Sequence, residues 1–478
     1  MQGQAVFSQV RVPRLVSDGM VLQRGTNIRI WGWAGPGEEI TVEFDGEKAK
    51  TVTNDAGRWA LLLGPRKPGG PYNMEIDGIN HIELRNVFVG DVWLCSGQSN
   101  MEMSMEQVKE KYPEVIAQSK NDLIRQFHVP LRYDFNEPHD NVASGHWEAA
   151  NPTTVLSFSA VAYFFAREIY DRYHVPVGLI NNAVGGSPAE AWLDADALRE
   201  FPVAEAVAAR YANSAYRDSI AAADKAAGKE SYFQFQPGGL FNGMLFPVVN
   251  YTVKGVIWYQ GEANVSRAVE YRRLFSALIT DWRRNFPQPE LPFLFVQLPN
   301  YMPVKEQPEE SNWAELREAQ RLTLSLPLTG MAVTTDLGET NNIHPLNKED
   351  VAKRLFLAAE HVAYEKINFI YSGPLYHSIH IKHNKIRVSF DEVEGGLIVK
   401  GGGELHGFAI AGADNHFVWA KAIISGKSVI VWSDQVPQPV AVRYAWADNP
   451  ESANLYNRDA LFQDGLPASP FEGRKIPK

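Results

Sequence analysis

Five near-continuous apolar runs divide the middle of the chain. They are residues 87–94, 177–182, 253–259, 293–298 and 330–335. Strands of this composition are buried on both faces, which is typical of a parallel sheet with helices on either side. Helical stretches at residues 159–173 and 348–364 supply such covering layers. The sequence therefore predicts an α/β fold, with a parallel sheet in a three-layer α/β/α domain at residues 86–375.

The two ends of the chain have a different pattern. Residues 10–85 are short alternating segments separated by turn clusters such as Gly35-Pro36-Gly37 and Asp45-Gly46. Strands at that spacing indicate a β-sandwich. The turn-rich pattern returns in residues 376–478, so we expect β-sandwich-like material from both terminal regions.

A stretch rich in Ala and charged residues, 197–232, predicts a helical insertion. Insertions at the carboxyl edge of such sheets commonly shape the substrate cleft. A solvated helical hairpin without that role is the alternative.

Charge and cysteine content exclude several classes of protein. The formal charge of -10, without a dense Lys/Arg stripe, argues against nucleic acid or an anionic membrane as a partner. The sequence contains no run of 18 apolar residues, so it predicts no membrane span. The single cysteine, Cys95, excludes an internal disulfide and a Cys-rich zinc site, and its place in a strand predicts a buried, inert thiol.

The remaining composition fits a small, solvated ligand. Twelve Trp and eighteen Tyr residues offer faces that stack on sugar rings, although such residues also build cores. No His-x-x-His, His-Glu-x-x-His, Walker or dinucleotide-binding glycine pattern occurs, so neither a metal nor a nucleotide cofactor is implied.

Ser99 follows the first apolar run, in Gly97-Gln98-Ser99-Asn100-Met101. The carboxyl end of a strand in an α/β sheet can hold a nucleophile at the mouth of a crevice, beside backbone N–H groups. A serine at a strand-to-helix junction can also be a helix cap. The second residue after Ser99 is Met101, which differs from the Gly-x-Ser-x-Gly elbow, so another serine-hydrolase scaffold is indicated.

Three more blocks follow apolar runs in order. They are residues 182–188 (Asn182 to Pro188), 258–264 (Trp258 to Asn264) and 341–345 (Asn341 to Pro345). Together with the Ser99 block they resemble the SGNH (GDSL-like) hydrolase superfamily and, within it, the sialate O-acetylesterase family of carbohydrate esterases. The resemblance covers nearly the whole chain, including residues 31–38 and 453–457.

The resemblance implies a location as well as a fold. It implies an SGNH-hydrolase catalytic domain at residues 86–375 and a periplasmic or secreted glycan-degrading enzyme. Residues 1–5 lack the charged and apolar regions of a secretory signal, so the location rests on the resemblance alone.

His344 is the candidate base for Ser99, because SGNH enzymes place their histidine in a loop of this kind. The orienting acid often lies three residues earlier, where this chain has Asn341. Three arrangements remain: a Ser-His dyad with the Asn341 backbone carbonyl as acceptor, an acid supplied by Asp336, or one supplied by Glu339.

The oxyanion of the tetrahedral intermediate needs donors. The backbone N–H of Ser99 is one, and the Gly185-Gly186 turn offers another. In the third block a side-chain amide is expected, and Gln260 is preferred over Asn264 because it lies closer to the strand end.

Three further residues are expected to support the site. Gln98 and Asn100 flank the nucleophile, and Glu262 orients the Ser99 loop or a substrate hydroxyl.

The predicted function is a carbohydrate O-acetylesterase, similar to sialate 9-O-acetylesterases, that passes through an acetyl-Ser99 intermediate. One alternative keeps this mechanism and changes the substrate to acetylated xylan, xyloglucan or another plant glycan. Another is a noncatalytic glycan-binding protein on a degenerate hydrolase core. The sequence leaves the sugar, the third triad member and the oligomeric state open.

Overall fold

The computed structural model describes residues 9–367, 369–458 and 465–475. The chain forms two compact units, one of Met1–Ile257 with Ala277–Pro292 and one of Trp258–Ser276 with Phe293–Lys478. Strand β11 (Gly255–Tyr259) and helix α7 (Ala268–Asn285) contribute residues to both. The three-region division at residues 85 and 375 stays a prediction.

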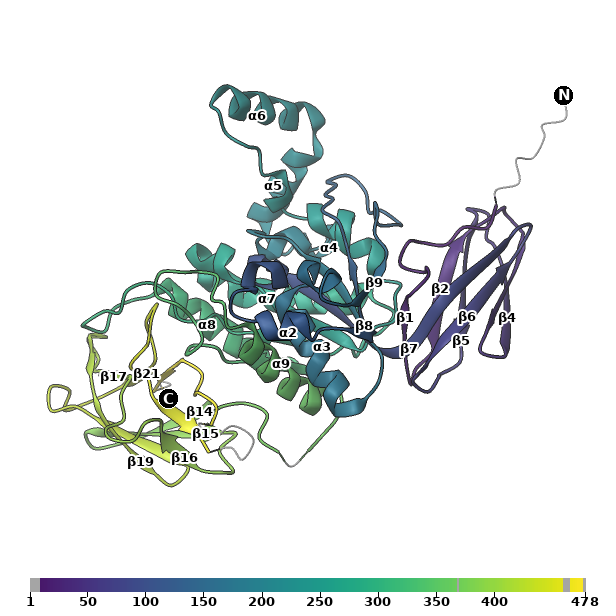
Figure 1. Cartoon of the computed structure of the whole chain (residues 1–478). Helices are drawn as coiled ribbons and strands as arrows, with labels where there is room; N and C mark the ends of the chain where they lie inside the picture. Colours follow the sequence, from purple (N-terminus) through teal and green to yellow (C-terminus); the bar gives the residue numbers. More distant parts are fainter. Residues whose placement is uncertain (1–8, 368, 459–464, 476–478) are drawn as a thin grey trace. The chain divides into compact units, whose positions relative to one another are not determined.

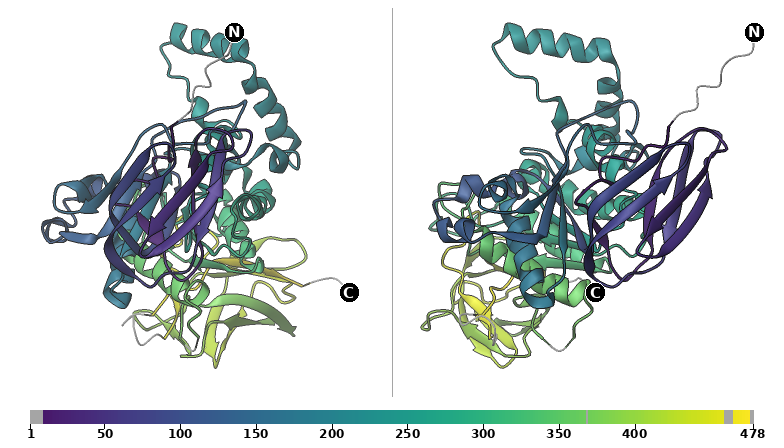
Figure 2. Two further views of the ribbon diagram at one scale, coloured as in Figure 1. Left: turned by 90° about the vertical axis from the view of Figure 1, so that its right-hand side faces the viewer. Right: turned by 45° about the vertical axis from the view of Figure 1, so that its right-hand side comes forward.

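The N-terminal part of the first unit is made of two small sheets (Figures 1 and 2). Its strands are β1 (Val21–Gln23), β2 (Ile28–Trp33), β3 (Glu39–Phe44), β4 (Glu47–Val52), β5 (Arg58–Leu63) and β6 (Gly69–Asp77). β2 and β5 pair antiparallel, and β3 pairs with both β4 and β6. Ile40, Val42 and Phe44 of β3 are fully buried and alternate with more exposed residues, as a strand with one buried face requires.

The long strand β7 (His81–Gly97) leaves these small sheets and enters the parallel sheet (Figure 1). Its first part pairs antiparallel with β6, whereas Asp91 to Gly97 pair parallel with β10 (Val177–Ala183). Every residue of β7 from Val87 onward is buried. One continuous strand therefore crosses the boundary expected near residue 85.

Beyond β10 the sheet of the first unit continues with β8 (Asn121–His128), which is parallel to β10, and β9 (Trp147–Ala150), which is antiparallel to β8. Helix α3 (Ala160–Tyr173) begins at Ser159, whose side chain accepts the Ala162 N–H. Phe165 of this helix packs edge-on against Trp93 of β7, with ring centroids 4.9 Å apart. The predicted α/β class is confirmed, and Cys95 is buried as expected.

The stretch predicted as a helical insertion, residues 197–232, is helical over much of its length. It contains α5 (Pro202–Ala212) and α6 (Ser214–Ala226), preceded by the short α4 (Ala195–Leu198). Ala204 is the buried residue of α5, and α6 buries none of its residues. Figure 1 shows this pair of helices extending away from the sheet of its unit, so most of their surface is in contact with solvent.

Short helices fill the connections. Those with α labels are α1 (Ser99–Glu102) and α2 (Pro113–Ala117). The one-turn helices are η1 (Met105–Val108), η2 (Thr154–Ser157), η3 (Ala189–Trp192), η4 (Phe233–Phe235), η5 (Phe241–Leu245), η6 (Phe246–Val248), η7 (Glu262–Arg267) and η8 (Thr323–Ser325).

The second unit joins an α/β part to the C-terminal β region. The α/β part contains the parallel strands β12 (Phe293–Val296) and β13 (Thr329–Ala332) with helices α8 (Asn312–Leu322) and α9 (Lys348–Val362). Arg317 of α8 is fully buried and donates hydrogen bonds to the carbonyls of Leu298, Pro299, Ala447 and Asp448 at 2.6–2.9 Å. One side chain thus connects the loop after β12 with the C-terminal region.

The C-terminal region is β-rich, as the sequence predicts. One antiparallel sheet has the order β14 (Leu375–Lys382), β15 (Lys385–Asp391), β20 (Ser428–Trp432), β19 (Lys421–Ser425). A second has the order β18 (Phe417–Trp419), β17 (Phe408–Ala411), β21 (Ala441–Tyr444), β23 (Phe471–Arg474). β16 (Leu397–Val399) pairs with β22 (Leu455–Asn457), and residues of all three sheets share one hydrophobic core.

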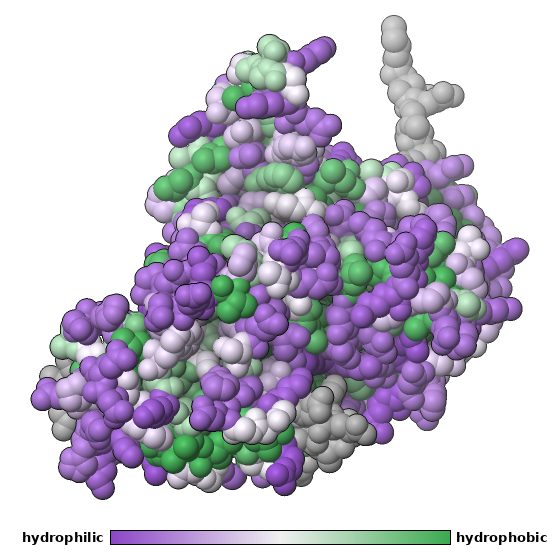
Figure 3. Space-filling model, turned by 60° about the vertical axis from the view of Figure 1, so that its left-hand side comes forward, coloured by the Kyte–Doolittle hydropathy of each residue, from purple (hydrophilic) through white to green (hydrophobic). Residues whose placement is uncertain are grey.

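The face in Figure 3 is mostly hydrophilic, with hydrophobic residues in small groups. This agrees with a chain that carries 46 basic and 56 acidic residues. Among the described residues, none of the helices has the length and apolar character needed to cross a bilayer.

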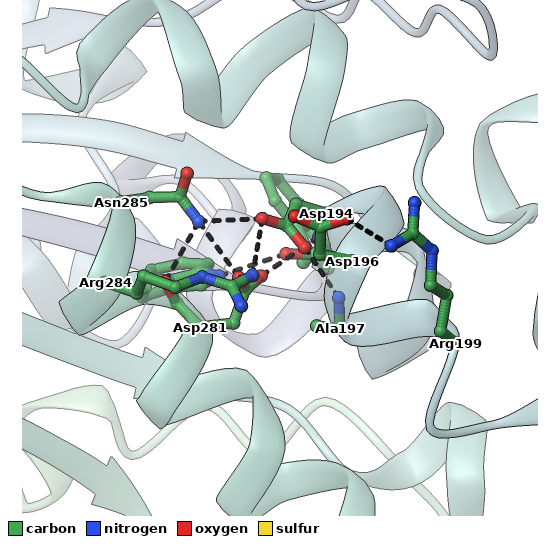
Figure 4. Close-up of polar contacts among 9 residues, drawn as sticks. Asp194, Asp196, Ala197, Arg199, Asp281, Arg284 and Asn285 are labelled. Atoms are coloured by element: carbon green, nitrogen blue, oxygen red, sulfur yellow. Dashed lines mark hydrogen bonds and ion pairs between the residues drawn. The ribbon is translucent and has the colours of Figure 1, made fainter.

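Two carboxylates, Asp194 at the start of α4 and Asp281 near the end of α7, join these two helices (Figure 4). The Asp281 carboxylate accepts the backbone N–H of Asp194 at 2.9 Å, and Arg284 lies 2.7 Å from both carboxylates. The Asn285 amide also donates to Asp194 and Asp281, at 3.1 and 2.9 Å. Burial, with the nearby Asp194 carboxylate, raises the pKa of Asp281 to about 7, against the opposing effects of the Asp194 N–H hydrogen bond and of Arg284.

The raised pKa predicts a pH-dependent contribution to stability. The folded protein binds the Asp281 proton more tightly than the unfolded chain, so this contribution is complete below about pH 4 and is lost as the pH rises to about 7. Relative to Asp281→Asn, the wild-type free energy of unfolding should fall over that window, by at most about 4 kcal/mol. Urea denaturation at several pH values measures this change in the free energy of unfolding. The exposed Asp196→Asn is the control, and parallel curves for wild type and Asp281→Asn would contradict the prediction.

Candidate active site

Ser99 is the first residue of α1 and lies directly after the end of β7. Gly97 has a φ of 135°, a conformation that side chains rarely adopt, and this lets the chain turn at that point. The N-cap of α1 is Gln98, without a side-chain capping bond, so the alternative that Ser99 caps this helix is wrong. Gln98 and Asn100 are buried and Ser99 is half-buried, so the serine is the most accessible of the three.

The Gly185-Gly186 turn lies beside Ser99 in the same unit. Ala183 at the end of β10 is in register with Gly97 at the end of β7, so the two strands deliver their following residues to one place. A Cβ atom built on Gly185 would be 3.6 Å from the Ser99 Cβ. The first two sequence blocks are therefore brought together.

Glu102 is a site residue that the sequence analysis missed. Its carboxylate accepts the Gly185 N–H at 2.7 Å. Burial raises the pKa of Glu102, and this hydrogen bond opposes the increase. Residues i and i+3 lie on one helix face, so the position of Glu102 three residues after Ser99 was the available signal.

The third block places Gln260 and Asn264 in the second unit, both fully buried. The Gln260 Nε2 donates to the Asn264 Oδ1 at 2.7 Å, and the Tyr271 hydroxyl donates to the Gln260 Oε1 at 2.9 Å. This chain of hydrogen bonds turns the Asn264 carbonyl toward Gln260 and its NH₂ group the other way. The geometry thus favours Asn264 as the amide donor, with Gln260 as the residue that orients it.

The loop that carries His344 is organised by Glu339, also in the second unit. The Glu339 carboxylate accepts the Leu346 N–H at 2.8 Å and the Asn342 side-chain amide at 3.1 Å. The Asn342 Oδ1 in turn accepts the His344 N–H at 3.0 Å. Asn341 is exposed on the same loop.

His344 is half-buried, and burial followed by the positive charge of Lys348 lowers its pKa. A lowered pKa keeps the imidazole neutral at physiological pH, as a general base requires. Lys348 is itself fully buried, with its Nζ 5.5 Å from the centre of the Tyr259 ring. Burial lowers the pKa of Lys348 to about 7, against the opposing effects of Glu262 and Glu339. A lysine in a helical stretch gave no sequence signal for this role.

Asp336 forms a different set of contacts. Its two carboxylate oxygens lie 2.6 and 2.8 Å from the Arg354 guanidinium, and the Tyr456 hydroxyl donates to one of them at 3.1 Å. Burial alone would raise the pKa of Asp336, but Arg354 outweighs it and the net shift is downward. These contacts favour a structural role, in which Asp336 connects the end of β13 to α9 and β22.

No group of three or more His, Cys, Asp or Glu side chains suited to a metal ion occurs within residues 9–367, 369–458 and 465–475.

Comparisons with known proteins agree on one family. The family model described as "Carbohydrate esterase, sialic acid-specific acetylesterase" matches residues 89–355. The sialate O-acetylesterase of Homo sapiens is 30% identical over 506 residues, covering 96% of this chain and 92% of its own length. That of Mus musculus is 29% identical over 520 residues, with coverages of 96% and 94%.

A solved structure is similar over the whole chain. The crystal structure of a novel carbohydrate acetylesterase from Xanthomonas citri is 41% identical, with a TM-score of 0.86, and the match covers 98% of this chain and 100% of that one. The carbohydrate O-acetylesterase activity expected from the sequence is therefore supported by both sequence and fold. This chain belongs to the sialic acid-specific acetylesterase family of carbohydrate esterases, which are hydrolases.

Proposed function

We propose that the protein removes acetyl groups from O-acetylated sugars in two steps through Ser99. In the first step the Ser99 Oγ attacks the acetyl carbonyl carbon while His344 takes the hydroxyl proton. The tetrahedral intermediate then collapses, and the sugar leaves as an alcohol with the proton held by His344. In the second step His344 deprotonates a water that attacks the carbonyl carbon of acetyl-Ser99. The bond from this carbon to the Ser99 Oγ then breaks, His344 returns the proton to the Oγ, and acetic acid leaves and ionises to acetate.

The observation that carries this proposal is the position of Ser99. It is a half-buried serine two residues after the end of β7, whose residues from Val87 onward are all buried, and it lies next to the backbone of the Gly185 turn. The lowered pKa of His344 supports its assignment as the base. With Asp336 held by Arg354 and Tyr456, we favour a Ser-His dyad over a triad completed by Asp336. Glu339 is assigned to the loop rather than to the imidazole.

The oxyanion donors in this proposal are the Ser99 N–H, the Gly185-Gly186 turn and the Asn264 amide. The Gly185 N–H already holds a carboxylate oxygen of Glu102 at 2.7 Å, which supports its ability to bind an anionic oxygen. The ester oxygen would have to replace Glu102 there. A periplasmic or secreted location, where glycan substrates are found, completes the proposal.

Ser99→Ala and His344→Ala should each lower kcat for p-nitrophenyl acetate by about three orders of magnitude or more, because the covalent route is lost. The control is Ser157→Ala, which changes an exposed serine bonded to the Thr154 carbonyl and should keep wild-type rates. A folded Ser99→Ala protein that keeps a tenth of the wild-type turnover would refute the assignment of Ser99 as the nucleophile. Only a wild-type protein without esterase turnover would favour the noncatalytic glycan-binding alternative.

Asn264→Ala should reduce kcat by about 100-fold with little change in KM, because an oxyanion donor acts mainly in the transition state. Gln260→Ala should reduce kcat by a smaller factor, because the Asn264 amide remains and loses only the hydrogen bond that orients it. Steady-state kinetics of the two variants measure the difference. A larger kcat loss at Gln260 than at Asn264 would return the donor role to Gln260.

Aromatic side chains next to the Gly186 turn bear on which sugar is bound. A Cβ atom on Gly186 would be 2.7 Å from the Phe235 ring. Tyr232 stacks on Phe235 with ring centroids 5.4 Å apart and an interplanar angle of 10°, and Tyr232 is 51% exposed. Phe233 packs edge-on against Tyr211 of α5, with ring centroids 5.9 Å apart, which ties this segment to the insertion.

We propose that Tyr232 and Phe235 form a stacking platform for the sugar that carries the acetyl group. Flat aromatic faces pack well against the C–H face of a pyranose with equatorial substituents, such as xylose or glucose. The platform therefore favours the alternative of a neutral plant glycan over sialic acid.

Tyr232→Ala should raise KM for acetylated xylo-oligosaccharides about tenfold and leave p-nitrophenyl acetate hydrolysis unchanged, since the small ester has no sugar ring to stack. Acetate release from these oligosaccharides and from O-acetylated sialic acids measures the preference. Tyr216→Ala, on the insertion but outside the Tyr232–Phe235 stack, is the matched control. An unchanged KM at Tyr232→Ala would remove the platform from the proposal, and faster release from sialic acids would restore sialate as the substrate.

A further inference from the structure

A cavity of about 250 Å³ lies in the first unit, against the N-terminal strands β2 and β5. Its lining includes Arg29, Trp31 and Trp33 of β2, Arg58 of β5, and Asp140 and Asn250 from loops. None of the lining residues belongs to the four blocks around Ser99 and His344. The cavity is smaller than the ~300–1,000 Å³ of typical drug-sized ligand pockets, which suits a single ring.

Strand register explains how the cavity is built. β2 and β5 pair antiparallel, with Trp33 opposite Arg58 and Trp31 opposite Ala60. Alternate residues of a strand share a face, so Arg29, Trp31 and Trp33 lie on one side of this pair. The small Ala60 leaves open the space that a larger side chain would fill. Trp31 is held by an edge-on contact with Tyr251, whose ring centroid is 6.2 Å away, whereas Trp33 is only half-buried.

The polar groups of the cavity are partly used within the protein. Arg58 and Asp140 form an ion pair at 2.6 Å, with side chains 58% and 37% exposed. The Arg29 Nε is buried and has no hydrogen-bond partner among the residues that the structure describes. Because this atom is closed to solvent, the charged groups that a ligand can reach in the cavity are the Arg58 and Asp140 side chains.

We propose that this cavity is a second sugar site, which binds one pyranose ring of a glycan chain. The half-buried face of Trp33 would stack on the C–H face of the ring. The Arg58–Asp140 pair offers a donor and an acceptor side by side for neighbouring hydroxyls. The site would hold a polymer on the enzyme while other acetyl groups of the same chain are hydrolysed. The binding proposal does not depend on the role of Ser99.

The experiment measures glycan binding by a protein that cannot turn over its substrate. In a Ser99→Ala background, xylo-oligosaccharides, gluco-oligosaccharides and an oligosaccharide of uronic acids are titrated by calorimetry. Trp33→Ala removes the stacking face, and Ala60→Phe fills the cavity without removing any of its polar groups. Each should weaken sugar binding by at least about tenfold. Trp419→Ala, which changes an exposed tryptophan of the other unit, is the matched control and should bind as the parent does.

Binding at the platform near Gly186 is separated by Tyr232→Ala in the same background, which should leave the cavity's affinity intact. Tighter binding of uronic acids than of neutral sugars would show that Arg58 pairs with a sugar carboxylate, and the reverse would show that the Arg58–Asp140 pair binds hydroxyls. With Ser99 restored, Trp33→Ala and Ala60→Phe should hydrolyse p-nitrophenyl acetate at wild-type rates, which confirms that they fold. The proposal is overturned if the parent binds none of these sugars at millimolar concentrations, or if the folded Ala60→Phe protein binds them as tightly as the parent.

Discussion

The parallel pairing between β7 and β10 is the interaction on which the candidate active site of the first unit depends. Seven consecutive register pairs, from Asp91↔Val177 to Gly97↔Ala183, end both strands at the same level. Ser99 follows one strand end and Gly185 follows the other, so their proximity is set by backbone hydrogen bonds rather than by flexible side chains. β7 begins in the N-terminal β region, so that region is built onto the strand that leads to Ser99.

In the second unit, buried polar side chains hold the loops in position. Arg317 donates to four backbone carbonyls, and Asp336 is shared by Arg354 and Tyr456. Such groups destabilise the folded state if they lose their partners, so they specify one arrangement of the loops that they connect. Glu339 has the same function within the His344 loop. Carboxylates that resemble catalytic acids in the sequence are therefore used to hold loops in place.

The electrostatics of the His344 region favour a neutral base. His344 is next to Lys348, and burial lowers the pKa of both. A positive neighbour disfavours a second positive charge, so the His344 imidazole stays uncharged near neutral pH. A carboxylate partner would have the opposite effect, since it raises the pKa of a histidine. The lowered pKa of His344 agrees with a dyad. Without a carboxylate partner the imidazolium is less stabilised, but the imidazole is already neutral, and so able to accept a proton, at neutral pH.

The sequence by itself determined five strands of the α/β region in order, β7, β10, β11, β12 and β13, and the positions of the four blocks. Runs buried on both faces are apolar at nearly every residue, and this pattern is local, so β10 and α3 were predicted almost to their ends. The positions of Ser99 and of the Gly185 turn at strand ends follow from the same pattern.

Tertiary structure alone decided which side chains meet. The Glu102 carboxylate accepts a hydrogen bond from Gly185, 83 residues away in the sequence, and Asp336 accepts one from Tyr456, 120 residues away. Asn264 is oriented by Gln260, which is only four positions away. The burial of Lys348 and the space opposite Ala60 also depend on packing between distant segments. Local sequence pattern carries no information on such contacts, because the partner of a polar side chain is chosen by the packing of the whole unit.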